Sequence, residues 1–398
     1  MAKIRFDHNL PKGWRKVKLG EAADFTKGRK PSRLVNKKLS ANLKEYILLG
    51  NEKFYTELDK LLVDVIPSDI LIVADGASSG TILAGKEGVL GSTLVRIRIK
   101  NEVQDEIDAK FLYFGLKHFE RVFQSVLTGS AIPHIDQKNL RDFELFIPED
   151  INEQKRIAEI LSAFDEKIEL NNKINKILEE MAQTIFKEWF NENSKFKKQK
   201  AKLGKWQIGY LGDGICSEII KPGVRKFNRE KTYLATTDVV KNEIVNERVK
   251  IAYNNRPIRA NSEPVMNSIW FAKMIHTYKV LFFFEGNKDD IERYILSTGF
   301  MGIKALRNMQ YYLYLFINSE RFHQIKDTLV QGAVQEAITN ANVKEIKILI
   351  PPENLINKFN EKVQPLITKI FQNKGENQKL AALRDLLLPK LMSGEIKI

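Results

Sequence analysis

The sequence has little of the chemistry that enzymes and secreted proteins usually carry. Cys216 is the only cysteine among 398 residues, which excludes an internal disulfide and a cysteine-based zinc site. The five histidines are scattered and form no His-x-x-x-His pair that would hold a metal. Neither a Gly-x-x-x-x-Gly-Lys-Ser/Thr phosphate loop nor an Asn/Asp-Pro-Pro-Tyr/Phe tetrapeptide occurs. We therefore expect a chain that binds rather than catalyses, with no catalytic residue and no metal site.

Long apolar runs are also missing. No window approaches the roughly eighteen apolar residues of a membrane span, and the N-terminus has no apolar run of signal-peptide length. These absences predict a cytoplasmic protein outside the membrane.

Positive charge, in contrast, is in excess: 64 Lys plus Arg against 50 Asp plus Glu leave a net charge of +14. Such an excess favours a polyanionic partner, with nucleic acid first and an anionic membrane surface second.

The chain contains two near copies of one pattern. Residues 129–148 reappear as residues 332–351 at a constant offset of 203 (332 − 129), and both copies end in an apolar, strand-like run and a proline. Trp14 likewise matches Trp206, at an offset of 192 (206 − 14). A period near 200 residues is too long for a solenoid repeat and indicates a duplicated unit of domain plus helix.

Each copy begins with a globular pattern. Residues 10–148 and 202–351 carry short, strand-like apolar runs punctuated by glycine, with helical spacing over 111–127 in the first copy and 309–330 in the second. Each copy is thus predicted to be a compact α/β domain. The polar, lysine-rich stretch 195–202 between them is typical of a linker.

A long helix is predicted after each globular part. Residues 149–190 contain neither glycine nor proline and carry an apolar stripe, and an uninterrupted helix of this extent is roughly 60 Å long. Apolar residues recur 206 positions later, so the two helices are expected to bury their stripes on each other. Pro365 and Gly375 are expected to kink or break the second helix.

The predicted fold class is therefore α+β, with two similar globular α/β domains, two long helices and a pseudo-two-fold internal repeat. The predicted divisions are a first globular domain at 1–148, a central long helix at 149–192, a second globular domain with its N-terminal linker at 193–351, and a distal long helix at 352–398.

Two loops at matching places in the copies carry clustered cations, residues 27–38 and 221–231. Such loops suit phosphate contacts, and their Arg or Asn side chains can reach base edges; a solvated charged loop is the plainer explanation for either one alone. The turn at residues 75–81 fits a phosphate nest and a simple strand connection equally well. The candidate DNA-binding residues, chosen by loop position and residue type, are Lys27, Arg29, Lys30, Ser32, Arg33, Ser78, Ser79, Thr81, Ser130, His134, Lys221, Arg225, Lys226, Asn228, Arg229, Lys273, His276 and Gln335.

Several of these patterns together resemble the specificity subunits of type I restriction-modification systems (the HsdS family). The resemblance lies in the opening segments 10–14 and 19–21, the unit that closes at 129–148, the helix start at 153–157 and the C-terminal segment 387–396. Each motif is weak alone, whereas their order, duplication and spacing are specific, and they cover almost the whole chain.

The resemblance implies two target-recognition domains, each reading one half of a bipartite sequence in double-stranded DNA. It implies that the long helices form an antiparallel coiled coil whose length sets the gap between those halves. Two modification (methyltransferase) subunits would dock on these helices, and restriction (motor and nuclease) subunits would join them. No cofactor is expected in this chain; S-adenosylmethionine, ATP and magnesium are expected on the partner subunits.

Two other functions stay open at this point. The chain could be a structural or interaction scaffold whose globular halves bind protein rather than DNA. A self-sufficient DNA methyltransferase or nuclease is the third hypothesis, which the missing motifs disfavour.

Overall fold

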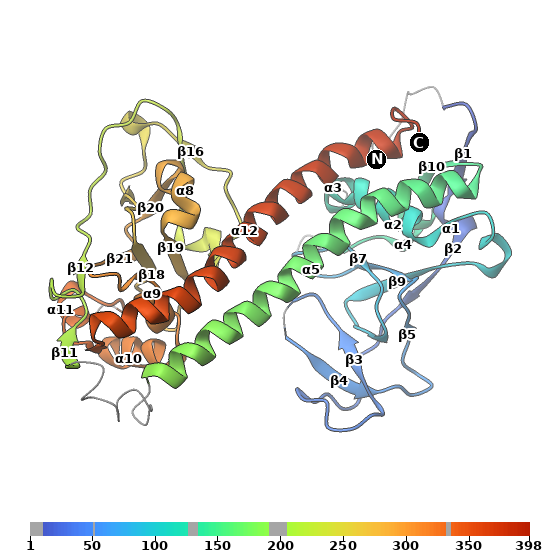
Figure 1. Cartoon of the computed structure of the whole chain (residues 1–398). Helices are drawn as coiled ribbons and strands as arrows, with labels where there is room; N and C mark the ends of the chain where they lie inside the picture. The colour runs from blue at the N-terminus through green and yellow to red at the C-terminus, as the bar shows by residue number, and fades with distance from the viewer. Residues whose placement is uncertain (1–10, 51, 126–133, 191–204, 332–335) are drawn as a thin grey trace. The chain divides into compact units, whose positions relative to one another are not determined.

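The computed structural model describes residues 11–50, 52–125, 134–190, 205–331 and 336–398. The chain divides into two compact units: unit 1 comprises Met1–Glu169 with Asn377–Ile398, and unit 2 comprises Leu170–Glu376. Two helices of 40 residues, α5 (Ile151–Phe190) and α12 (Glu353–Met392), contribute residues to both units (Figure 1). These units are defined by packing, and the predicted domain boundaries stay a prediction.

Unit 1 is built on two four-stranded sheets and a two-stranded ribbon. The first sheet has the order β2-β9-β6-β7 and is antiparallel throughout. The second has the order β4-β3-β8-β5, with β3 and β8 parallel, and the ribbon pairs β1 with β10. The strands are β1 Trp14–Lys18, β2 Ala23–Lys27, β3 Leu43–Ile47, β4 Phe54–Glu57, β5 Asp64–Val65, β6 Ile70–Val73, β7 Ile82–Ala84, β8 Gly88–Leu90, β9 Leu94–Ile99 and β10 Glu144–Pro148.

Short helices and the ends of the long helices complete the core of unit 1. Phe111 (1% exposed) and Leu112 lie in one apolar cluster with Leu161 of α5 and Leu391 of α12. Leu161 is fully buried, so shortening it to alanine would cost about 2–5 kcal/mol of stability. The short helices are α1 Leu19–Ala22, η1 Asn101–Val103, α2 Ala109–His118, α3 Glu120–Ser125 and α4 Gln137–Arg141.

Unit 2 repeats the sheet topology of unit 1. Its sheets have the orders β12-β21-β18-β19 and β16-β13-β20-β17, with β13 and β20 parallel, and β11 pairs with β22 as a ribbon. Strand for strand, this is the pairing of unit 1, with one additional two-stranded ribbon, β14-β15. The strands are β11 Gln207–Tyr210, β12 Ser217–Ile219, β13 Lys231–Leu234, β14 Val239–Val240, β15 Glu243–Ile244, β16 Lys250–Ile251, β17 Ala260–Ser262, β18 Ser268–Ala272, β19 Val280–Phe283, β20 Tyr294–Ser297, β21 Phe300–Ala305 and β22 Lys347–Ile350. The duplication predicted from sequence is therefore present in the fold.

Aromatic side chains dominate the core of unit 2. Phe186 of α5, Tyr312 of α9 and Phe359 of α12 lie in one buried cluster, with ring centroids 5.2 Å (Phe186–Tyr312) and 6.4 Å (Phe186–Phe359) apart. The remaining helices are η2 Thr236–Asp238, η3 Tyr253–Asn255, η4 Glu285–Asn287, α8 Lys288–Arg293, α9 Gln310–Ile317, α10 Glu320–Val330 and α11 Asn340–Val343. In this unit the long helices are thus anchored by large rings.

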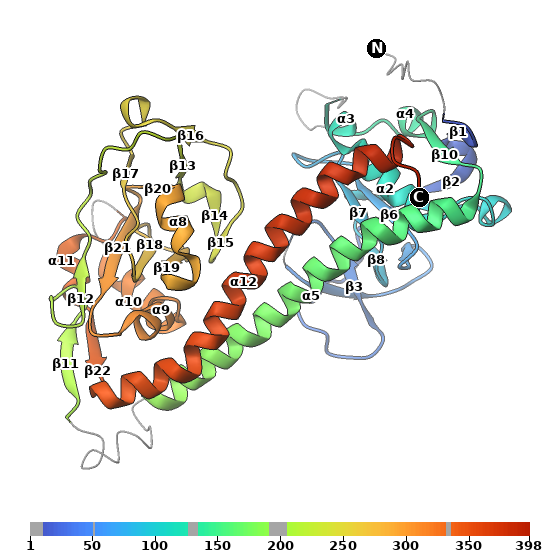
Figure 2. The ribbon, with the colours of Figure 1, turned by 45° about the horizontal axis from the view of Figure 1, so that its top comes forward.

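Within each unit, segments of α5 and α12 pack against each other and run antiparallel (Figures 1 and 2). In unit 2, Asn171 donates a hydrogen bond to Glu376 (2.8 Å), and Asn373 donates one to Asn175 (2.8 Å), so the partner number falls as the residue number rises. In unit 1, Arg384 pairs with Asp165. The predicted pairing of the two helices is confirmed, but the predicted burial of their apolar stripes on each other is wrong for Ile177, Met181 and Leu383, which are exposed.

Three further expectations for the helices are wrong. The predicted helix at 111–127 is two helices that meet at Phe119, and residues 126–133 lie outside the described part of the chain. The one predicted at 309–330 divides at Ser319, whose hydroxyl accepts the amide of Phe322 as an N-cap. A kink or a break is expected in the distal helix; the break does not occur, because α12 continues through Pro365 and Gly375, and the kink stays a prediction.

The continuity of α12 has a packing explanation. Proline removes one backbone hydrogen bond and glycine costs about 1 kcal/mol in a helix interior. Against this, Val363, Ile367 and Ile370 of α12 are at most 1% exposed in the core of unit 2. Burying three such side chains contributes roughly 1.5–3 kcal/mol each, which exceeds the local costs.

Candidate nucleic-acid interface

In the first globular half, the predicted basic loop and the predicted turn meet at one edge of a sheet. Strands β2 and β6 both pair antiparallel with β9, where Lys27 and Ile72 lie opposite Val95, so both strands end on the same side. Lys27 Nζ lies 2.8 Å from the Asp75 carboxylate. His134 pairs with Asp75 through the backbone. The structure thus brings together Lys27, the turn 75–81 and His134, which are far apart in sequence.

The cations of the first basic loop are exposed between two anchors. At one end, the amide of Gly28 donates to the carbonyl of Leu94 (3.0 Å), and a side chain at Gly28 would lie 2.1 Å from the carbonyl oxygen of Gly91. At the other end, Val35 and Tyr55 exchange backbone hydrogen bonds of 3.0 and 2.8 Å. Between these anchors, four of the predicted DNA-binding residues are exposed: Arg29, Lys30, Ser32 and Arg33.

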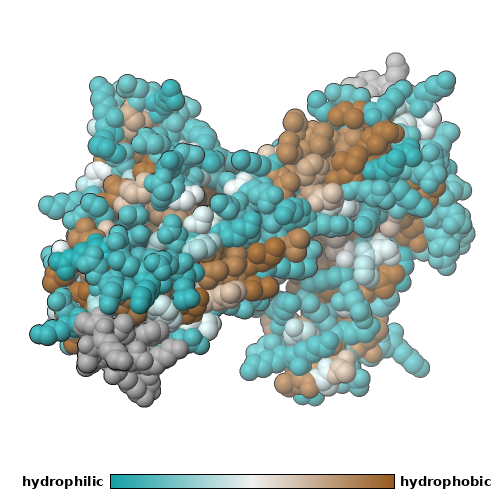
Figure 3. Space-filling model, in the orientation of Figure 1, coloured by the Kyte–Doolittle hydropathy of each residue, from teal (hydrophilic) through white to brown (hydrophobic). Residues whose placement is uncertain are grey.

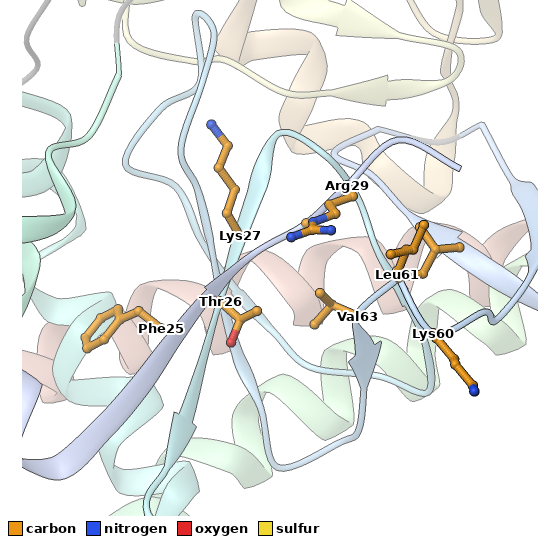
Figure 4. A pocket seen from close by; sticks show the side chains of 9 residues that line it. Phe25, Thr26, Lys27, Arg29, Lys60, Leu61 and Val63 are labelled. Atoms are coloured by element: carbon orange, nitrogen blue, oxygen red, sulfur yellow. The ribbon is translucent and has the colours of Figure 1, made fainter. Parts of the chain in front are cut away.

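An open hollow of about 520 Å³ lies beside this loop. Lys27 and Arg29 line it on one side, and Lys60, which the sequence reasoning missed, comes from the loop before β5 (Figure 4). Its lining contains no acidic side chain. Because Lys27 is already paired with Asp75, Arg29 and Lys60 are the cations that this hollow offers to a phosphate group.

The predicted residues of the turn differ in where they lie. The hydroxyl of Ser79 is buried and donates to the carbonyls of Ala74 (3.2 Å) and Gly76 (2.7 Å), so it fixes the turn from inside. Ser78 is exposed, and Thr81 is half-buried with its hydroxyl 3.4 Å from the Gln124 amide. Ser78 is therefore better placed for an external ligand than Ser79.

Residues 76–80 also spell Gly-x-Ser-x-Gly, the pattern of a hydrolase nucleophile elbow. That elbow requires a sharp connection from a strand to a helix. Here the turn joins β6 to β7, two antiparallel strands. The structural context of a serine nucleophile is therefore not met at Ser78.

The second half repeats the arrangement. Strands β12 and β18 both pair antiparallel with β21, where Ile219 and Ile269 lie opposite Ile303, so they end at one edge. Lys221 follows the first strand, and Lys273 and His276 follow the second. Burial lowers the pKa of Lys273. The four other candidates of this basic loop are exposed: Arg225, Lys226, Asn228 and Arg229.

Arg225 differs from its neighbours because it has an acidic partner. Its Nε lies 3.1 Å from Glu263, which also accepts the Arg225 backbone amide (3.2 Å) and lies 3.4 Å from Lys231. Burial opposes ionisation of Glu263, but these hydrogen bonds and charges hold the pKa of its carboxyl below the usual value. The positive charge of Arg225 is thus partly neutralised by Glu263 within the protein. Glu263 gave no sequence signal because it lies 38 residues away.

Other predicted sites have no structural outcome. Ser130 and Gln335 lie outside the described residues. In the described ranges, no group of three or more His, Cys, Asp or Glu side chains could hold a metal, and no helix there is long and apolar enough to cross a membrane.

Comparison with known proteins agrees with this arrangement. Residues 11–180 match the family model described as type I restriction modification DNA specificity domain. The type I restriction enzyme MjaVIII specificity subunit of Methanocaldococcus jannaschii is 24% identical over 98% of this chain and 94% of its own length. The MjaIX specificity subunit of the same organism is also 24% identical, over 98% of this chain and 95% of its own. The resemblance to specificity subunits of type I restriction-modification systems that the sequence indicates is thus confirmed.

A solved member of the family has the same fold. The crystal structure of a type I restriction-modification S subunit from M. genitalium covers 98% of both chains with a TM-score of 0.63 at 18% identity. The predicted α+β class is thereby confirmed. The two cation-bearing sheet edges lie one in each of the two similar globular halves.

Proposed function

We propose that this chain is the DNA sequence-specificity subunit of a type I restriction-modification complex, and that each globular half reads one half of a bipartite target. One observation carries the proposal: the same sheet topology occurs twice, and in both copies basic loop and strand-connecting turn converge on the same sheet edge. A protein that recognises one undivided DNA site would need only one such sheet edge.

The charge of the loops supports binding to the DNA backbone. The chain carries a net charge of +14, and eight Lys or Arg side chains stand among the candidate residues of the two basic loops. Phosphate contacts release counterions from the DNA. The logarithm of the binding constant therefore falls linearly with the logarithm of the salt concentration, with a slope of about −0.9 for each phosphate contacted. We expect a steep salt dependence, whereas salt-insensitive association without DNA retention would favour the protein-binding scaffold instead.

The helices supply a spacer in this proposal. Each has 40 residues, and an α-helix of that length spans about 60 Å. Adjacent readable stretches of the major groove lie about 34 Å apart, one helical turn of DNA. We propose that the length of the helices sets the gap between the two half-sites.

Exposed apolar faces of the long helices support docking of modification subunits. In unit 2, α5 exposes Leu170, Ile177 (56%) and Met181; in unit 1, α12 exposes Leu383 (48%) and Leu386. Figure 3 shows apolar side chains gathered along these helices. Ile177 and Leu383 are 206 residues apart (383 − 177), the offset of the helix repeat. Repeat-related apolar faces suit two copies of one partner.

This docking can be tested by stoichiometry. Ile177→Asp and Leu383→Asp should each reduce the assembled complex from two modification subunits to one, measured by native mass spectrometry. Lys176→Ala, an exposed change beside the first site, should retain both copies. Retention of two copies in both aspartate variants would contradict the assignment.

S-adenosylmethionine, ATP and magnesium are proposed to bind the partner subunits, and restriction subunits to complete the complex.

The recognition function itself is tested by selection from a randomised DNA library. The complex of this chain with its modification subunit should enrich one asymmetric motif in two parts separated by a fixed gap. Enrichment of no split motif would contradict the proposal.

A further inference from the structure

A buried lysine side chain fixes the backbone of the turn between β18 and β19. Lys326 of α10 is 1% exposed, and its ammonium donates to the carbonyl oxygens of Ala272 (3.3 Å), Met274 (2.8 Å) and Thr277 (2.7 Å). An ammonium has three N–H donors. The turn therefore uses all of them, which fixes its backbone at three points.

The next residue on the helix holds the tip of the same turn. The Asp327 carboxylate accepts the backbone amide of His276 (3.1 Å) and the hydroxyl of Tyr278 (2.6 Å), and lies 3.1 Å from Nδ1 of His276. His276 has φ +54°, a left-handed conformation that residues with a Cβ adopt at a cost. The carboxylate offsets that cost by binding both the backbone and the side chain.

The turn is also supported from the side. Ile275 donates to the carbonyl of Glu336 (3.0 Å), and Ile338 donates to the carbonyl of Lys273 (3.0 Å). Three side chains nevertheless project outward from this fixed backbone, with Met274 48%, His276 75% and Tyr278 44% exposed. Exposed side chains on an already ordered backbone lose little further entropy when they bind a ligand.

The clamp is absent from the other repeat. Counting back by the 203-residue offset of the neighbouring repeat, Lys326 corresponds to Phe123 and Asp327 to Gln124. In unit 1, Phe123 is 8% exposed and belongs to the apolar core. The hydroxyl of Ser79 fixes the matching turn there. The clamp is therefore particular to the second half, where a target different from that of the first half has to be read.

We propose that residues 273–278 are the element with which the second globular half reads DNA base edges, and that Lys326 and Asp327 are the positioning residues that fix it. The inference rests on the proposed DNA-recognition function. With Nδ1 of His276 and the hydroxyl proton of Tyr278 facing Asp327, Nε2 of His276 can hydrogen-bond to a base edge and the Tyr278 hydroxyl oxygen can accept a hydrogen bond from one. Met274 offers an apolar contact for a thymine methyl. The cations of the neighbouring loop 221–229 would contact phosphates.

The first test changes exposed side chains, which leaves the fold intact. His276→Ala and Met274→Ala chains, each assembled with the modification subunit, are compared with the wild type by library selection. Preference at one or more base pairs of one half-site should fall at least about fivefold, while the other half-site and the salt dependence of affinity stay unchanged. Unchanged motifs in both variants would overturn the proposal.

The second test addresses the clamp. Lys326→Met and Asp327→Asn should relax the same half-site as His276→Ala, because the turn loses its fixed backbone. Arg321→Met is the matched control, since it removes one positive charge from an exposed position of the same helix; its motif should equal that of the wild type. If circular dichroism shows that the Lys326→Met variant does not fold, the proposal is decided by Asp327→Asn together with the two surface variants, His276→Ala and Met274→Ala.

The outcomes separate this inference from the proposed function. A wild-type complex that enriches no split motif contradicts DNA recognition itself, and this inference with it. A wild-type complex that enriches a split motif, together with clamp variants that weaken both half-sites equally, overturns only the assignment of residues 273–278.

Discussion

Asp69 is a buried carboxylate that is paired with one arginine. Its side chain is fully buried, and Arg98 donates to its two oxygens at 2.6 and 2.7 Å. The backbone amide of Ile66 supplies a third hydrogen bond (2.8 Å). Arg98 also reaches Asp64 at 2.9 Å, and the hydrogen bonds that it donates to Asp69 and Asp64 raise the pKa of the guanidinium in spite of its partial burial. Without Arg98, the buried Asp69 carboxylate would lose its cationic partner.

Replacing Arg98 with methionine should therefore destabilise unit 1 strongly. The expected loss in free energy of unfolding is about 3–5 kcal/mol, because the Asp69 carboxylate would be left buried without its cation. Urea denaturation followed by circular dichroism measures it. Arg15→Met is the control, since the Arg15–Glu106 pair is largely exposed and should change stability by at most about 1 kcal/mol. Equal losses would contradict this account.

Cys216 gives a second prediction at the residue scale. Its thiol is fully buried, and burial raises its pKa to about 11. Because the thiolate is the reactive form, the folded chain should resist an aromatic disulfide reagent at mildly alkaline pH, where an exposed cysteine reacts. After denaturation, reaction of Cys216 in the same assay should release one equivalent of the aromatic thiolate per chain. Rapid reaction of the folded chain would show that the thiol is accessible.

At the scale of single elements, the long helices tolerate residues that usually end helices. α12 contains both Pro365 and Gly375, and a Cβ on Gly375 would meet no atom within 4 Å. The pair also buries a polar contact, in which Asn373 donates to Asn175 although one amide atom of each lacks a protein hydrogen-bond partner among the described residues. Replacing such a pair by apolar side chains often costs nothing, so a role in fixing the register is a reasonable explanation for it.

Gly375→Ala should stabilise the protein. Alanine loses less backbone entropy than glycine in a helix interior, which is worth about 0.5–1 kcal/mol, and the site has room for the added methyl group. Thermal unfolding measures the shift. Gly302→Ala is the opposing control, because its Cβ would lie 2.6 Å from the buried Trp270 ring and should cost about 1–3 kcal/mol. A destabilised Gly375→Ala variant would indicate that α12 requires flexibility at this position.

On the scale of the whole molecule, the matching topologies predict that recognition is modular. A chimera that replaces only residues 202–351 with the corresponding segment of another specificity subunit should change one half of the DNA target. The other half and the gap should stay as in the wild type, since the first globular part and both long helices are retained. Library selection on the assembled complex gives the result. Changes in both halves would contradict modular reading.

Much of this architecture is predictable because it is repeated. The offsets of 203 and 206 residues show the duplication, and a stripe without glycine or proline shows α5. The basic loops are found by composition alone. The division of the helix expected at 309–330 depends on the hydroxyl of Ser319, which caps α10, and apolar spacing does not reveal such a cap. Lys326 was missed although Phe322, Lys326 and Val330 share a helix face, all at most 1% exposed.

The sequence by itself determined that the chain holds two similar globular parts and two long helices, because periodicity and duplication are properties of the order of residues. Only the tertiary structure decided which side chains serve each surface. That Lys27 meets Asp75, that Ser79 faces inward and that Lys326 fixes a turn about 50 residues away depends on strand pairing between distant segments. Such pairing is set by burial of whole faces, which no local pattern contains.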